Sequence, residues 1–268
     1  SKRRALSQLS PYFCSMKQTR TWSFIALVFV LVVGSFGCTE ANTAVSRPQT
    51  SPEVEPSQFL TEVTISETEL NAYLAMDTLE IITENLTEYF KATNEARWGD
   101  LMHYFPLHKK QGDTAFVNGS MRALDHWTER GVRNRTASAE ILYASPVLHD
   151  NDQNVVLLNM RLSHFVEFFA QYDGPPADGM KGMVESNYGK GNATYKETPL
   201  QTGDSVPEIR YWEINGLNRI WAVNHVDSSH WCFLPPNFNE TGAAGMMGAN
   251  AMVEALRHRR ANDPTAKK

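Results

Sequence analysis

The sequence predicts an α+β fold, in which N-terminal helices pack on an antiparallel β-sheet behind an export signal and a flexible tether. Three observations lead to this prediction. Residues 24–33 form a short, uninterrupted apolar run that is followed by a cysteine. Between residues 66 and 130, apolar side chains recur at the three- and four-residue spacing of amphipathic helices. From Ala137 the period changes to two, which is typical of strands with one buried face.

Residues 16–38 have the layout of a lipoprotein-type signal peptide. Lys17 and Arg20 precede ten apolar residues, and Cys38 follows directly after a glycine. A membrane-spanning helix needs about 20 apolar residues, so this run is too short to span and its flanks are those of an export signal. The cysteine resembles the lipobox of bacterial lipoproteins, and the resemblance implies that Cys38 is acylated.

This resemblance implies a protein anchored to a membrane of the bacterial cell envelope, facing the periplasm or the surface. Ser35 and Gly37 also fit ordinary signal cleavage, so a secreted protein and an uncleaved anchor stay open as alternatives. Several acyl chains are needed for lasting attachment, because a single chain binds a membrane only marginally.

The rest of the chain divides by composition. Residues 1–15 are expected to be an upstream extension, because Met16 opens a conventional signal. Residues 39–65 are rich in Thr, Ser, Pro and Glu and predict a disordered tether. Residues 66–236 are expected to form the folded domain, and residues 237–268 a C-terminal helix with a basic tail.

The charge balance excludes nucleic acid as a partner. The chain has 25 Lys and Arg and 30 Asp and Glu, and residues 1–37 hold five of the former and none of the latter. The mature chain therefore has a formal charge of −10, which repels phosphates. Because Cys14 is expected to lie upstream of the signal and Cys38 to be acylated, no disulfide is expected within the domain.

The first helix is predicted over residues 66–96. Ser66 and Glu69 have the spacing of a capping box, in which each side chain satisfies a backbone N–H at the helix start. Gly99 is expected to end this helical stretch. Two further helices follow over residues 100–104 and 120–130.

The second half of the domain is predicted to be mostly strands. Asn215-Gly216 between two apolar runs is a strong signal for a tight hairpin turn. Gly189 is expected to end a helix in the left-handed cap position. The predicted strands are 137–147, 154–169, 208–214, 219–226 and 229–234, and the predicted helices are 178–188 and 242–258.

This order of elements resembles the nuclear transport factor 2-like cone, also called the SnoaL-like or cystatin-like superfamily. Residues 81–105 resemble its opening helix pair, residues 185–196 its inserted helix and Tyr-Gly-Lys turn, and residues 219–234 its closing hairpin. The resemblance covers residues 66–236 and implies a curved, cone-like sheet around a pocket. The superfamily includes isomerases, dehydratases and binding modules, so the fold alone does not choose a function.

His164 is the strongest single candidate for a catalytic or ligand-binding residue. It interrupts the apolar face of the long strand, which in a cone fold would line the pocket, and it could act as an acid or base or orient a ligand. A core histidine with one hydrogen bond is the simpler interpretation. Asp100 and Tyr104 lie at the helix break as further candidates, although a turn residue and a core residue are the simpler interpretations. Met160 and Trp221 complete the predicted ligand pocket.

No metal or cofactor is expected. His225 and His230 flank Asp227, but the sequence offers no third and fourth ligand for a zinc site. Glycines 242, 245 and 248 follow no strand that would make them a dinucleotide-binding loop.

The preferred functional prediction is a non-enzymatic, envelope-anchored module that binds a small hydrophobic ligand or an envelope protein. The alternative is a small cofactor-free isomerase or dehydratase that uses His164 with a carboxylate or Tyr104. A third hypothesis is an assembly factor or homodimer that pairs through an aromatic sheet face, if Trp212 or Trp221 faces outward.

Overall fold

The computed structural model describes residues 59–60, 62–106, 114–150, 152–169, 172–174, 178–198 and 209–267. The predicted extension, the signal peptide with Cys38 and residues 39–58 and 61 of the predicted tether lie outside these residues. The end of the tether belongs to the folded part instead, because Leu60 and Val63 are buried in the core and Thr64–Ile65 pair with the sheet. Within the described ranges, no helix is both long and apolar enough to cross a membrane.

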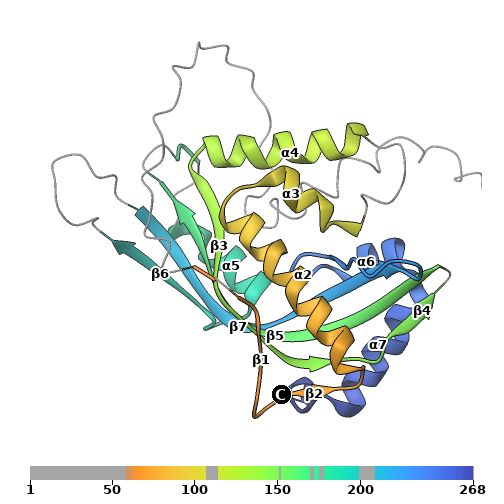
Figure 1. Cartoon of the computed structure of the whole chain (residues 1–268). Helices are drawn as coiled ribbons and strands as arrows, with labels where there is room; N and C mark the ends of the chain where they lie inside the picture. The colour runs from red at the N-terminus through yellow and green to blue at the C-terminus, as the bar shows by residue number, and fades with distance from the viewer. Residues whose placement is uncertain are drawn as a thin grey trace, which may run out of the picture.

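The described part is a mixed α+β structure built on one open, curved sheet (Figure 1). The strand order is β1-β3-β5-β7-β6, and all pairs along this path are antiparallel except β1 with β3. Short strands β2, β4 and β8 pair with β3, β5 and β7. The strands are β1 (Thr64–Ile65), β2 (Asn71–Ala72), β3 (Val132–Ala144), β4 (Leu148–Asp150), β5 (Gln153–Phe168), β6 (Ala193–Thr198), β7 (Ile209–His225) and β8 (Cys232–Phe233).

Helices cover both faces of this sheet. Helices α2, α3, α4 and α5 lie on the inner face, and α6 and α7 lie on the outer face, behind the sheet in Figure 1. Two 3-10 turns, η3 (Asp178–Met180) and η4 (Pro264–Lys267), precede α5 and follow α7. The helices are α2 (Met76–Asn94), α3 (Trp98–His103), α4 (Thr114–Glu129), α5 (Lys181–Tyr188), α6 (Glu240–Met247) and α7 (Ala249–Asn262).

The core is divided by the alternation of side chains along the central strand β5. Leu158 and Met160 point to the inner face and pack with Leu86 and Phe90 of α2. Leu157, which directly precedes Leu158, points to the outer face and packs under α6 and α7. Near the other end of β5, Val166, Phe168 and Trp212 form a third cluster with α5. The predicted strand 154–169 is thus confirmed, but it is buried on both faces over much of its length.

The first helix begins ten residues later than predicted, at Met76. The Ser66 hydroxyl does accept a hydrogen bond from the Glu69 amide, at 3.3 Å, but it closes a turn between β1 and β2 rather than a helix start. The backbone explains the difference. The Ser66 and Tyr73 amides each donate to carbonyl oxygens of β3 at 3.0 Å, so this segment satisfies its hydrogen bonds as an edge of the sheet.

The predicted hairpin at Asn215-Gly216 is wrong, because β7 runs through these residues without a turn. Asn215 and Gly216 pair with Ser163 and Leu162 of β5, so the long partner strand holds them in the ladder. The Asn192 side chain also approaches Gly216 so closely that a Cβ there would lie 3.2 Å from its Nδ2. The glycine at this position therefore serves close packing, not a turn.

The C-terminal region also differs from the prediction. The helix expected over residues 242–258 is two helices, α6 and α7, that meet at Gly248 with φ 90°. The basic tail is docked against the sheet: Asp263 is 1% exposed and accepts hydrogen bonds from Asn159 and Arg259, each at 3.0 Å. Strand β6 was not predicted, whereas the helix that ends at Gly189 is confirmed.

Candidate functional site

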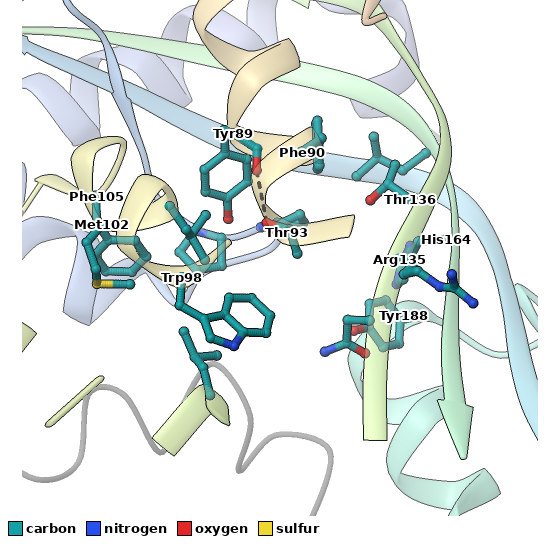
Figure 2. A pocket seen from close by; sticks show the side chains of 16 residues that line it. Tyr89, Phe90, Thr93, Trp98, Met102, Phe105, Arg135, Thr136, His164 and Tyr188 are labelled. Atoms are coloured by element: carbon teal, nitrogen blue, oxygen red, sulfur yellow. Dashed lines mark hydrogen bonds between the residues drawn. The ribbon is translucent and has the colours of Figure 1, made fainter. Parts of the chain in front are cut away.

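A cavity of about 140 Å³ lies between the inner face of the sheet and helices α2, α3, α4 and α5 (Figure 2). Aromatic and aliphatic side chains make up most of its wall, with a few polar groups on the strands. The lining residues are Tyr89, Phe90, Thr93, Trp98, Leu101, Met102, Phe105, Leu124, Asn134, Arg135, Thr136, Leu162, His164, Tyr188, Pro235 and Pro236.

The apolar wall comes from a sharp turn between two helices. Tyr89 and Thr93 are four residues apart on α2, so both point to the same side of that helix. Ala96 then adopts φ 55°, a left-handed conformation that turns the chain back at the end of α2. As a result, Trp98 and Met102 of α3 face the cavity from the side opposite the sheet (Figure 2).

The polar wall comes from β3 and β5. Thr136 lies directly opposite His164 in the antiparallel pair, and Asn134 lies two residues along β3 on the same face. The His164 side chain is buried, with 9% exposure, and its ring meets the Tyr188 ring edge-on at 4.8 Å between centroids. Burial lowers the pKa of His164 to about 4, so the imidazole is neutral at pH 7.

Two polar atoms of this wall have no hydrogen-bond partner. They are Nδ1 of His164 and Oδ1 of Asn134, and both are buried from solvent. A buried polar atom left without a partner costs about 1–3 kcal/mol, and native structures hold few of them. Their position in the lining of one cavity indicates a place where a ligand would supply the missing hydrogen bonds.

The cavity interior has no charged side chain among its described lining residues apart from Arg135, whose side chain points away from it (Figure 2). Arg135 instead pairs with Glu167 on the outer face, with N–O distances of 2.6 and 2.5 Å. Burial raises the pKa of Tyr89 and raises that of Tyr188 to about 12, so both phenols keep their protons.

The residues predicted as a site from the sequence do not come together. His164 lines the cavity, and Met160 lies on the same strand face but is fully buried in the core. Tyr104 and Asp100 line a separate surface groove, where Asp100 forms an ion pair with Arg97. Trp221 lies on the outer face of the sheet under α6 and α7. His164 therefore has neither Tyr104 nor Trp221 as a neighbour across this cavity.

The histidines of the final turn make only local contacts. The His225 ring nitrogens lie 3.2 Å from Asp152 and 3.7 Å from Asp227. His230 Nε2 lies 2.9 Å from the backbone oxygen of His103. Across the described ranges, no three His, Cys, Asp or Glu side chains are grouped so that they could hold a metal ion.

The aromatic surface expected for assembly is also arranged differently. Trp212 is 2% exposed in the cluster with α5, and Trp221 is 1% exposed under α6 and α7. Neither faces outward, so neither supplies the pairing surface on which that hypothesis depended. The homodimer stays a prediction without these two side chains.

Several cavity residues were missed by sequence reasoning. The predicted strand began at Ala137, although β3 begins at Val132. The period of two extends back from Ala137 through Val132, Asn134 and Thr136, and this alternation places the two polar residues on the inner face. Tyr89 and Trp98 carry no such signal, because core aromatics and cavity aromatics look alike in a sequence.

Comparisons of the chain with protein-family models, with curated proteins and with solved structures found no match.

Proposed function

We propose that this chain is a lipid-anchored envelope protein whose folded part, a cone of the nuclear transport factor 2-like kind, binds a small uncharged ligand. The observation that carries the binding proposal is the buried His164 ring, whose Nδ1 has no partner on the wall of an apolar cavity. Concave sites with apolar walls and a few convergent polar groups are the usual form of small-molecule sites.

The size of the cavity supports a ligand about as large as one ring. An engineered protein cavity of about 150 Å³ takes up benzene. The cavity here, at about 140 Å³, matches that size. Trp98, Phe90 and Met102 offer apolar and aromatic surface for such a ring.

The protonation state of His164 in the cavity wall favours binding over catalysis. A general base works best when its pKa lies near the working pH, and the pKa of His164, at about 4, is far below neutrality. The isomerase or dehydratase alternative also requires a carboxylate or Tyr104 beside His164. Neither an Asp nor a Glu occurs among the described residues that line the cavity, and Tyr104 lines the separate groove.

Calorimetric titration with benzene, toluene and phenol tests the proposal. We expect at least one of them to bind at a single site, and the variant Leu162→Phe to lose that binding because the larger side chain fills the cavity. The matched control is Leu157→Phe on the outer face of the same strand, which overpacks the protein without reaching the cavity. Failure of all three compounds to bind the wild-type protein would overturn the proposal.

The membrane anchor has its own test. We expect Cys38→Ala to move the protein from the membrane fraction to the soluble fraction. If the variant stays in the membrane fraction and its mass includes residues 16–37, the segment is an uncleaved anchor and the lipoprotein proposal is wrong.

A further inference from the structure

We infer that the ligand is a single-ring compound with a hydroxyl group, and that Asn134 and His164 together hold this hydroxyl. The inference rests on the proposed binding function and narrows it to a chemical class, of which phenol is the simplest member.

The register of β3 and β5 brings the two groups to one spot. Asn134 pairs with Val166 and Thr136 pairs with His164, so Asn134 and His164 are diagonal neighbours on the inner face. Diagonal neighbours in an antiparallel pair lie about 7–8 Å apart. When both side chains extend into the cavity, one ligand oxygen fits between them and forms a hydrogen bond of about 2.8 Å with each.

The hydrogen-bonding capacity of the two atoms is matched by a hydroxyl in either tautomer of His164. Oδ1 of Asn134 only accepts, so the ligand must donate a hydrogen to it. Nδ1 of neutral His164 donates in one tautomer and accepts in the other. A hydroxyl has one donor and two acceptor lone pairs, so it satisfies the amide oxygen and the imidazole nitrogen together. A carbonyl or an ether lacks the donor.

Charged ligands do not fit the same wall. The neutral His164 ring offers no countercharge to a carboxylate, since burial keeps its pKa near 4. Arg135 is directed to the other face of the sheet, where Glu167 takes up its guanidinium. An ammonium group would likewise meet no carboxylate among the described lining residues. Burying either ion without a partner is strongly unfavourable.

Calorimetry with the full-length protein at pH 7.5 tests the inference with four ligands of similar size: phenol, toluene, benzoate and benzylamine. We expect phenol to bind at least tenfold more tightly than toluene, because toluene leaves both polar atoms buried without partners. Benzoate and benzylamine should not bind. Equal affinity for phenol and toluene, or tighter binding of either ion, would overturn the hydroxyl inference and leave the binding function standing. Binding of none of them would overturn both.

Substitutions of Asn134 and His164 test whether these two residues contact the hydroxyl. Asn134→Leu and His164→Phe should each reduce phenol affinity to the toluene level while changing toluene affinity less than threefold. Ser163→Ala, next to His164 but on the outer face, is the control and should leave both affinities unchanged.

Should either variant fail to fold, the wild-type protein provides the same answer by nitrogen NMR. The His164 Nδ1 resonance should shift with phenol and not with toluene, and an identical response to both ligands would overturn the inference.

Discussion

At the scale of single residues, β3 and β5 bury polar groups in two different ways on their two faces. On the inner face, His164 is buried alone and neutral beside a cavity. On the outer face, Arg135 and Glu167 are buried as a bidentate ion pair, and Phe59 stacks on the guanidinium at 3.8 Å. His164 keeps a ring nitrogen without a protein partner, to which a ligand can bind, whereas Arg135 and Glu167 satisfy each other's hydrogen-bonding groups.

The burial of His164 makes stability depend on pH. Its pKa is about 4 in the folded protein and 6.5 when exposed, so between these values the unfolded chain binds a proton that the folded chain does not. The His164 contribution is therefore complete above pH 6.5 and is lost as the pH falls toward 4, by up to about 3 kcal/mol. Urea unfolding of the wild type and of His164→Gln at several pH values measures it. A difference between the two proteins that stays constant from pH 7 to 4.5 would contradict this prediction.

Removing one partner of the Arg135–Glu167 pair should lower the free energy of unfolding strongly, whereas replacing both partners by apolar residues should lower it little. Glu167→Leu leaves a buried guanidinium without its anion and should lower the free energy of unfolding by about 3–5 kcal/mol. The double variant Arg135→Leu/Glu167→Leu removes both charges and should recover most of that loss. Urea denaturation measures the free energy of unfolding of the two variants. A double variant less stable than Glu167→Leu would show that the pair itself supplies the stability.

At the scale of elements, two helix junctions set the positions of the flanking helices. Ala96, at φ 55°, directs α3 back over the cavity, and Gly248, at φ 90°, separates α6 from α7. Beyond the second junction, the Asp150 carboxylate of β4 accepts a hydrogen bond from the Ala251 amide at 3.3 Å. A carboxylate at this place stabilises the N-terminus of α7, because the helix dipole is positive there.

Gly248→Ala should therefore destabilise the protein by about 1–3 kcal/mol. The glycine has a φ that other residues rarely adopt, and an added Cβ would overlap the Asp150 carboxylate. Gly245→Ala, three residues earlier in α6, is the matched control, because nothing lies within 4 Å of a Cβ there. It should be neutral or stabilising by up to about 1 kcal/mol. Equal effects of the two substitutions in urea denaturation would refute the role of this junction.

At the scale of the whole molecule, the sheet is the middle layer between two sets of helices. Helices α6 and α7 cover the outer side chains of β5 and β7, including Leu157 and Trp221. The inner helices cover the other face and enclose the cavity. A long strand buried on both sides holds the two sets of helices together, because both of its faces contribute apolar burial.

Detaching the outer layer should expose an apolar surface. Ala255 of α7 is fully buried against the sheet, whereas Val253 is 49% exposed on the same helix. Ala255→Glu places a charge in the packed layer and should increase the binding of the dye ANS and promote association in size-exclusion chromatography. Val253→Glu should do neither. If Ala255→Glu behaves as the wild type, α7 is not required to cover the sheet.

Local patterns in the sequence determined the α+β class, the long central strand and the helix that ends at Gly189. These features depend on periodicity and on backbone conformations that a short stretch of chain dictates by itself. The same patterns singled out His164, because a polar residue in an apolar alternation is visible without a structure.

Only the tertiary structure decided which residues surround His164. Asn134 and Tyr188 are far from it in sequence and reach it through strand register and helix packing. Tertiary hydrogen bonds also overrode two local signals, since the segment after Ser66 became a sheet edge and Asn215-Gly216 stayed in a strand. In each case, the local pattern assigned the backbone N–H and C=O groups to a helix start or a turn, but a strand distant in sequence formed hydrogen bonds with them instead. Such a strand is in place only once the chain has folded.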